Sequence, residues 1–306
     1  MIKAPIALFV YNRPLHTQRT IEALQKNEFA SESDLFVFSD GPKNGAASDK
    51  VMEVRKYLGG ITGFKNVTIY ERNENFGLAR SIISGVTEII NKSGRVIVME
   101  DDLITSPYFL RFMNEGLEFY ENEDKVISVH GYIYPVASPL PETFFLKGAD
   151  CWGWATWKRG WNLFEADGAK LLYELISKKL TLEFDVNGSY AYTQMLEHQI
   201  AGKNNSWAIR WHASAFLKKK LTLYPGKSLV QNIGLDESGT HSGTSNNYDV
   251  ELSKNPVKIL KIELAQNDNA LREIEKYWRS CRVSHPTLFR RALSIIKKIF
   301  AIFSNG

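Results

Sequence analysis

A short apolar run that ends in three consecutive carboxylates constrains the fold of this chain most strongly. Residues 96–99 read Val-Ile-Val-Met, and Glu100, Asp101 and Asp102 follow at once. Such a run predicts a strand buried on both faces. The acids then belong at its carboxyl end, which is the edge where open α/β sheets bind ligands. Because neighbouring carboxylates repel and hard oxygens suit Mg²⁺ or Mn²⁺, the motif predicts either a divalent-cation site or a solvated turn.

The first 130 residues alternate between strand-like and helix-like patterns. Buried strands are expected at 6–11, 34–38, 66–70, 95–99 and 125–129, and helices at 17–27, 50–58, 78–91 and 107–120. This alternation predicts an α/β fold with a mostly parallel central sheet and flanking helices. Further along, helices are expected at 171–182, 190–199 and 209–217, and a short strand at 221–224.

Composition excludes several classes of function. The net charge of +4 over 306 residues is mild, so we expect no nucleic-acid partner. The two cysteines, Cys151 and Cys281, lie far apart and are typical of a reduced, cytoplasmic protein. The sequence shows no signal-peptide pattern and no apolar run long enough to span a bilayer.

The glycine-rich motifs of the common nucleotide folds are missing. The first strand is followed by Val-Tyr-Asn-Arg-Pro (10–14), which is not the dinucleotide-binding fingerprint. The chain contains neither a P-loop nor the Gly-x-Ser-x-Gly elbow of α/β-hydrolases. Enzymes that hold a diphosphate through a metal ion remain.

Five motifs in order carry a family resemblance over about residues 6–243. They are Tyr-Asn-Arg-Pro (11–14), Ser-Asp-Gly-Pro (39–42), Asn-Phe-Gly-Leu-Ala-Arg (75–80), Glu-Asp-Asp-Leu (100–103) and Trp-Gly-Trp (152–154). This order resembles the GT-A glycosyltransferases, in particular bacterial family-2-like sugar transferases, and is similar to N-acetylglucosaminyltransferase I. The resemblance implies a Rossmann-like domain over 1–250, with a nucleotide-sugar-binding half (1–102) and an acceptor-binding half (103–250). Residues 251–306 would then form a C-terminal helical extension.

In that family the acidic motif binds Mn²⁺ or Mg²⁺ together with the donor diphosphate. The resemblance implies that Asp102 is the metal ligand and that Asp101 contacts the donor ribose or sugar, with Glu100 in support. A divalent cation is useful there because cleavage of a sugar–diphosphate bond places negative charge on the leaving phosphate.

Other donor contacts are implied at the neighbouring strand ends. Tyr11, Asn12 and Arg13 follow the first strand, where the family seats the base and ribose. Arg13 would reach a phosphate, or would form a surface salt bridge. Asp40 would hydrogen-bond the base, or would only shape the turn after the second strand.

The remaining donor contacts are implied in two later motifs. Gly77 would permit a sharp turn into a helix, and Arg80 at that helix start would steady the donor. The segment with Trp154 would lie under the donor sugar and border the acceptor groove, with a core aromatic cluster as the alternative.

An inverting transferase needs one general base for the acceptor hydroxyl. The resemblance implies a carboxylate after the Gly-Trp segment, and Glu197 is the only acid between Asp185 and Asp236. Glu197 is therefore the candidate base and Asp185 the alternate, although Glu197 also fits a solvated helix face. His241, in a polar loop, would complete the metal shell or contact phosphate, or it would be an exposed histidine without a role.

The end of the chain has the pattern of an interfacial helix. Residues 284–306 contain no acid, and on a helical wheel their apolar side chains cover one side while Arg and Lys cluster on the other. This pattern predicts either binding to a membrane surface or docking on the protein's own core or a second subunit.

Together these features predict a metal-dependent inverting glycosyltransferase. It would move a sugar from a nucleotide diphosphate sugar, with UDP favoured, to a hydroxyl of a cell-surface glycan or a lipid-linked acceptor at the cytoplasmic face of a membrane. A nucleotidyltransferase and a catalytically inactive sugar-binding module are the alternatives.

Overall fold

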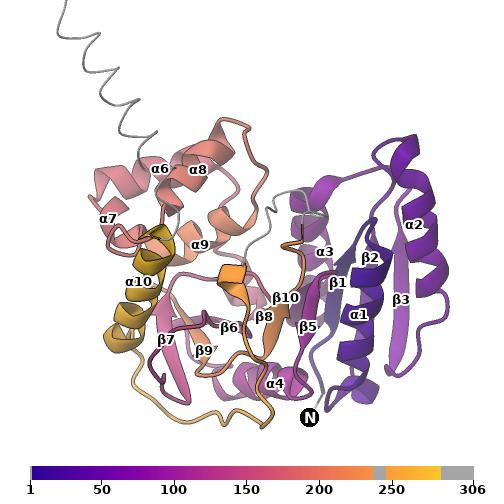
Figure 1. The fold of residues 1–306 in the computed structure, drawn as a ribbon, viewed down its shortest axis with the longest axis horizontal. Helices are drawn as coiled ribbons and strands as arrows, with labels where there is room; N and C mark the ends of the chain where they lie inside the picture. Colours follow the sequence, from indigo (N-terminus) through magenta and orange to yellow (C-terminus); the bar gives the residue numbers. More distant parts are fainter. Residues whose placement is uncertain (1, 237–245, 284–306) are drawn as a thin grey trace, which may run out of the picture.

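A central eight-stranded sheet organises the computed structural model, which describes residues 2–236 and 246–283 (Figure 1). Its strands are β1 (Ile6–Val10), β2 (Asp34–Ser39), β3 (Asn66–Glu71), β4 (Arg95–Glu100), β6 (Val126–His130), β7 (Thr143–Lys147), β8 (Trp154–Trp157) and β9 (Leu221–Pro225). Their order across the sheet is β3-β2-β1-β4-β8-β6-β9-β7.

Most neighbouring strands of this sheet are parallel. The pairs β3–β2, β2–β1, β1–β4 and β6–β9 are parallel, so Ile6 of β1 lies beside Leu35 of β2 and Ile97 of β4. In this sheet only β8 and β7 are antiparallel to their neighbours. The prediction of a mostly parallel sheet with flanking helices is confirmed, and the antiparallel β8 is a strand that the sequence patterns did not predict.

Helices cover both faces of the sheet. They are α1 (Pro14–Gln25), α2 (Gly45–Leu58), α3 (Gly77–Ser93) and α4 (Phe109–Phe119), close to the expected ranges. Alternate residues of β1 belong to two cores: Leu8 packs with α1, α2 and α4, whereas Phe9 packs with α3. Gly85 of α3 makes the second contact possible, because a Cβ there would lie 2.6 Å from the Phe9 ring.

A second group of helices lies beside β6 to β9. It comprises α5 (Lys158–Trp161), α6 (Gly168–Ser177), α7 (Thr181–Phe184), α8 (Tyr192–Ile200) and α9 (Ala208–Leu217). Helices α6 to α9 share a small core of their own around Leu175 and Phe184. The single helix expected at 171–182 is wrong. Lys179 has a left-handed backbone (φ 56°), which ends α6 and separates it from α7.

Two elements from the last third of the chain pack against earlier strands. Strand β5 (Leu103–Thr105) follows the acids directly and pairs antiparallel with β10 (Val230–Asn232). Helix α10 (Asp268–Val283) packs through Trp278 and Ile274 on Phe144 of β7 and Tyr224 of β9. The helical part of the C-terminal extension therefore lies against the main sheet.

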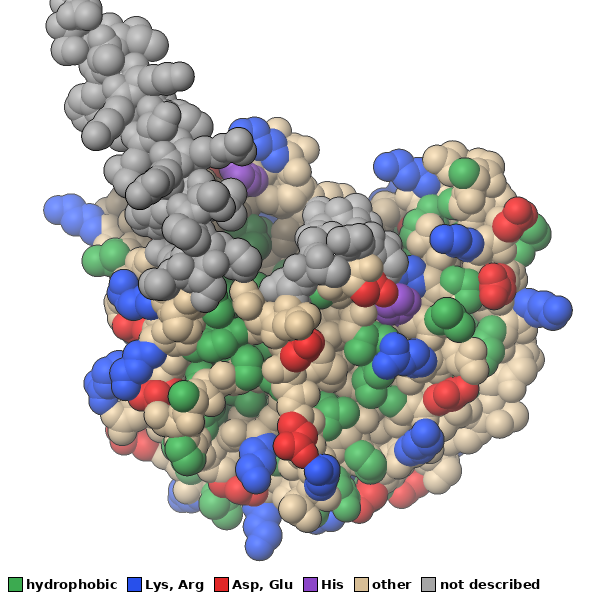
Figure 2. All heavy atoms as spheres, viewed as in Figure 1, with side chains coloured by type: hydrophobic (Ala, Val, Ile, Leu, Met, Phe, Trp, Pro, Cys, Tyr) green, Lys and Arg blue, Asp and Glu red, His purple; other side chains and the backbone are tan. Residues whose placement is uncertain are grey.

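The remaining predictions about the chain end concern residues 284–306, which lie outside the described part. No helix among residues 2–236 and 246–283 is both long and apolar enough to cross a membrane. On the face shown in Figure 2, acidic and basic side chains are interspersed with hydrophobic ones.

Candidate functional site

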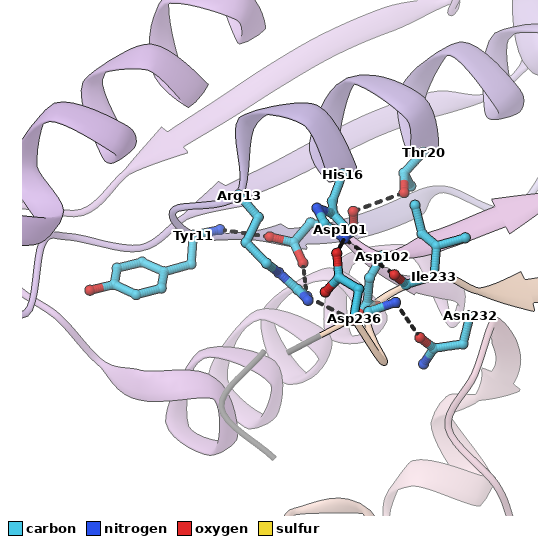
Figure 3. A network of polar contacts seen from close by, with 10 residues as sticks. Tyr11, Arg13, His16, Thr20, Asp101, Asp102, Asn232, Ile233 and Asp236 are labelled. Carbon is cyan, nitrogen blue, oxygen red and sulfur yellow. Dashed lines mark hydrogen bonds and ion pairs between the residues drawn. The ribbon is translucent and has the colours of Figure 1, made fainter. Parts of the chain in front are cut away.

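An ion pair between the ends of β1 and β4 forms the centre of the candidate site. Arg13, which precedes α1, donates through Nη2 to Asp101 Oδ1 at 2.6 Å and to Asp102 Oδ2 at 2.7 Å (Figure 3). The backbone N–H of Tyr11 donates to Asp101 Oδ2 at 3.2 Å, and the Tyr11 ring points away from the acids. The parallel pairing of β1 with β4 brings these two strand ends together, as expected from the sequence.

Negative charge exceeds positive charge at this edge of the sheet. Burial, helped by Asp102 and Asp101, raises the pKa of Glu100 to about 8. Burial also raises the pKa of Asp101, although the charge of Arg13 opposes that shift. Asp101 and Asp102 thus share the guanidinium of Arg13, and Glu100 lies close to both acids.

The donor atoms at this edge fit a divalent cation in part. Hard carboxylate oxygens in an environment with excess negative charge suit Mg²⁺ or Mn²⁺. Within residues 2–236 and 246–283, however, no three His, Cys, Asp or Glu side chains are arranged to hold a metal ion. Asp102 would hold such an ion with few other side chains, which is the way Mg²⁺ binds when substrate phosphates supply further ligands.

The segment after β10 closes over the ion pair, which the sequence patterns did not reveal. Ile233 donates its backbone N–H to the Asp102 carbonyl at 2.8 Å, and a side chain at Gly234 would collide with the Asp102 carboxylate. His16 of α1 lies 3.2 Å from the Ile233 carbonyl and 3.1 Å from Asp236 Oδ2 (Figure 3). Gly234 was the only hint in the sequence, since only glycine allows this close approach.

Asp40 holds the start of α3. Its carboxylate accepts hydrogen bonds from the backbone N–H groups of Phe76 and Gly77 at 2.8 and 2.9 Å, and from the Asn75 side chain at 3.1 Å. Both oxygens are therefore engaged within the chain, and Asp40 is buried. This placement favours the turn-shaping alternative over contact with a nucleotide base.

The Asn-Phe-Gly-Leu-Ala-Arg segment has the expected sharp turn. Gly77 has φ 69°, a left-handed conformation that favours glycine, and it is the first residue of α3. Arg80 is exposed and stacks on Phe76 with its guanidinium carbon 3.8 Å from the ring centroid. Among the described residues we find no contact between Arg80 and the acids. Asn12 follows β1 and directly precedes Arg13.

The expectation that Trp154 faces the donor sugar is wrong. Trp154 is fully buried in β8 and packs on Trp207, Trp211 and Trp161, with ring centroids 5.5, 5.7 and 5.8 Å away. It belongs to the core on the α3 side of the sheet. Trp152 lies two residues earlier, outside β8, and lines a cavity instead.

This cavity has a volume of about 900 Å³ and a lining rich in tyrosine and tryptophan. Trp152, Tyr132 and Tyr134 line one part, and α8 and α10 contribute Tyr192 and Trp278. Burial raises the pKa of the Tyr132, Tyr134 and Tyr192 hydroxyls, so they stay protonated hydrogen-bond donors. The cavity thus combines flat apolar surfaces with neutral hydroxyl groups.

The cavity lies next to the acidic strand end. Strands β4 and β8 pair antiparallel with Val98 opposite Trp154, so the residues just before Trp154 lie toward the carboxyl end of β4. The Cys151 thiol lies within electrostatic range of the acids. Burial is the main cause of its raised pKa, and the charges of Glu100 and Asp102 raise that pKa further. The cavity and the ion pair are therefore neighbouring parts of one site.

Asp150 is the carboxylate in this cavity. The Tyr224 hydroxyl donates to Asp150 Oδ2 at 2.8 Å, and His212 Nδ1 lies 3.9 Å from Asp150 Oδ1. Burial lowers the pKa of His130 to about 4, so this second histidine of the wall is neutral. Sequence reasoning missed Asp150 because it searched for the base after the Gly-Trp segment, and Asp150 precedes it.

Both acids proposed as the base lie elsewhere. Glu197 is exposed on α8, whereas Gln194, Met195 and His198 of the same helix line the cavity. Asp185 accepts a hydrogen bond from the backbone N–H of Thr193 at 2.6 Å and so holds the start of α8. Glu197 therefore does not line this cavity, and its assignment as the base stays a prediction. His241 lies outside the described residues.

Comparisons with known proteins give only weak likenesses. No protein-family model and no curated protein matches the chain. The crystal structure of S. aureus TarS matches with 15% identity and a TM-score of 0.32, over 47% of this chain and 24% of that one. A second structure, S. aureus TarS 1-349, gives 14% identity and a TM-score of 0.32 over 48% and 41%.

A third similar structure is the mannosyltransferase PcManGT from Pyrobaculum calidifontis in complex with GDP-Man and Mn²⁺. It gives 10% identity and a TM-score of 0.39, with 70% of each chain covered. The chain thus spans less than half the length of the two TarS structures that it matches. Likenesses of this strength do not decide a function.

Proposed function

We propose that this chain is a metal-dependent glycosyltransferase that uses a nucleotide diphosphate sugar, with UDP as the favoured nucleotide. The observation that carries the proposal is the adjacency of two features: the Arg13–Asp101–Asp102 cluster at the carboxyl edge of the sheet and the aromatic cavity beside it. The first has the charge and oxygen ligands for a metal-bound diphosphate, and the second has surfaces suited to a sugar.

The donor half of the site rests on Asp102 and Arg13. When bound, Mn²⁺ or Mg²⁺ stabilises the charge that develops on the leaving diphosphate. Asp102 would hold the ion, and Arg13 would turn part of its guanidinium toward a phosphate oxygen. Both oxygens of Asp101 are engaged, by Arg13 and by the Tyr11 N–H, so the proposed contact of Asp101 with the donor ribose or sugar requires Arg13 to turn away from it.

The acceptor half rests on the cavity. Flat aromatic side chains such as Trp152 and Tyr190 can cover the C–H faces of a sugar, while tyrosine hydroxyls donate hydrogen bonds to its oxygens. The acceptor we propose is a hydroxyl of a cell-surface glycan or of a lipid-linked saccharide. A carboxylate in this cavity would support a single displacement with inversion.

Association with the inner face of a membrane through residues 284–306 is a further part of the proposal. It rests on the basic amphipathic pattern of that segment alone. Removing 284–306 should abolish binding to liposomes that contain anionic lipids, with an unchanged melting temperature. Equal liposome binding by the full and shortened chains would contradict it.

The function is tested with a panel of UDP and GDP sugars in the presence of Mn²⁺. The expected result is a raised melting temperature with at least one donor, since a ligand that binds the folded state stabilises it, and release of the nucleoside diphosphate. Release of pyrophosphate instead would indicate a nucleotidyltransferase, and binding without turnover an inactive sugar-binding module.

A pair of variants tests the metal ligand. Asp102→Asn should lower release of the nucleoside diphosphate by about 100-fold or more, because charge stabilisation at the leaving group is lost. Asp124→Asn, an exposed acid before β6, is the matched control and should retain full activity. Release that survives Asp102→Asn would reject the proposed role of the acidic strand end.

A further inference from the structure

We propose that Asp150 is the general base that removes the proton of the acceptor hydroxyl. This assignment rests on the proposed glycosyltransferase function and replaces Glu197. Among the described residues that line the cavity, Asp150 is the only Asp or Glu. It therefore combines the required chemistry with the required place.

The position of Asp150 is fixed by both of its sequence neighbours. Cys151 and Trp152 lead into β8, which pairs with β4, so this segment lies toward the end of β4 that carries the acids of the proposed metal site. Ala149, on the other side, is buried, and its carbonyl lies 3.1 Å from His212 Nδ1. Asp150 is thus held at the junction between the proposed donor and acceptor parts of the site.

The two carboxylate oxygens of Asp150 have different surroundings. Oδ2 accepts the hydrogen bond from the buried Tyr224 hydroxyl at 2.8 Å, which orients the carboxylate. For Oδ1 the nearest partner within the described residues is His212 Nδ1 at 3.9 Å, too far for a hydrogen bond. Oδ1 is therefore available to accept a proton from a molecule in the cavity.

Other titratable groups of the cavity are less suited to this task. The tyrosine hydroxyls and the Cys151 thiol keep their protons, because burial raises their pKa. Burial lowers the pKa of His130 to about 4, which makes it a weak base. Burial also lowers the pKa of His212, and His198, on α8, is included in the test as a competitor.

The step balances without any further reactant. The acceptor oxygen forms a bond to the anomeric carbon of the donor sugar, and its proton passes to Asp150 Oδ1. The bond between the anomeric carbon and the diphosphate oxygen breaks, and its electron pair leaves with the nucleoside diphosphate. Asp150 then returns the proton to solvent.

The test compares four variants of the full chain: Asp150→Asn, Glu197→Gln, His198→Gln and the control Asp124→Asn. The probes are UDP-glucose, UDP-galactose, UDP-N-acetylglucosamine and GDP-mannose with Mn²⁺, and p-nitrophenyl glycosides as acceptors. Asp150→Asn should lower kcat by about 100- to 10,000-fold, which is the usual contribution of a general base. Its donor KM and melting temperature should stay close to those of the wild type, since an amide oxygen still accepts the Tyr224 hydrogen bond.

The outcomes separate the two proposals. If the wild type consumes none of the donors, with or without an acceptor, the proposed function fails. If the wild type is active and Asp150→Asn retains kcat within about threefold, or if Glu197→Gln or His198→Gln shows the large loss instead, only the assignment of Asp150 fails. If the melting temperature of Asp150→Asn is much lower than that of the wild type, Asp150→Ser replaces it, since serine is smaller and still accepts a hydrogen bond. The same limits on kcat then apply to Asp150→Ser.

Discussion

Replacement of Arg13 by Ala should destabilise the metal-free protein strongly. Arg13 bridges Asp101 and Asp102 with N–O distances of 2.6 and 2.7 Å, and the three side chains are only 17%, 7% and 15% exposed. Without the guanidinium, both carboxylates and the nearby Glu100 would face one another in a poorly solvated environment. Removing one partner of a buried ion pair costs about 3–5 kcal/mol.

Arg111 provides a matched control for this prediction. It also bridges two carboxylates, Glu28 at 3.3 Å and Glu115 at 2.8 Å, but its side chain is 37% exposed. Exposed ion pairs contribute about 0.2–1 kcal/mol each, because water and salt screen the charges. Arg111→Ala should therefore cost far less stability than Arg13→Ala, although both variants lose two ion pairs.

The assay is urea unfolding of both variants with EDTA and again with Mn²⁺. Mn²⁺ should raise the free energy of unfolding of Arg13→Ala more than that of the wild type, since the cation and the guanidinium neutralise the same oxygens. Equal losses for Arg13→Ala and Arg111→Ala would refute the argument that the acids are charged and poorly solvated. Equal effects of Mn²⁺ on wild type and Arg13→Ala would show that the metal does not use these oxygens.

Three further predictions concern other parts of the site. Because burial lowers the pKa of His130 to about 4, this imidazole takes up a proton in the unfolded state before it does so in the folded state as the pH falls below about 6.5. His130 by itself should then lower the free energy of unfolding by about 2 kcal/mol from pH 7 to pH 5, while the raised pKa of Glu100 acts in the opposite direction. Urea titrations of the wild type and of His130→Asn should therefore differ by this His130 contribution, with the variant losing less stability as the pH falls. Trp154→Ala should cost about 3–5 kcal/mol in the same titrations, whereas Trp152→Ala should cost less and raise the acceptor KM. Asp40→Ala should lower the melting temperature, with a loss of about 2 kcal/mol, because two N–H groups at the start of α3 lose their acceptor.

The parts of the fold that the sequence predicted are those encoded by local patterns. Strand β4 is recognisable because four consecutive apolar residues, 96–99, can be buried on both faces only inside a sheet. The acids that follow this run must then lie at the carboxyl end of the strand. The placement of Arg13 at the same edge followed as well, since parallel neighbouring strands end there, but its ion pairs with Asp101 and Asp102 were not predicted.

The parts that were missed depend on contacts between distant residues. Gly234 approaches Asp102 only because β10 pairs with β5, and no pattern around either short strand indicates that pairing. The two tryptophans show a related limit. Residues alternate between faces along a strand, but the bounds of β8 were unknown, so the sequence could not show which of Trp152 and Trp154 is buried.

The cavity shows why a domain boundary at residue 250 is hard to justify on functional grounds. Trp278 of α10 lines the cavity and packs on Tyr134 and Tyr190, with ring centroids 4.9 and 4.4 Å away. A boundary at 250 would remove this wall from the proposed acceptor site. A helical extension over residues 251–306 was predicted from the sequence, but only the packing of α10 beside β7 and β9 reveals its place next to the cavity. For this chain, the C-terminal extension is therefore better regarded as part of the proposed acceptor site than as an appendage to it.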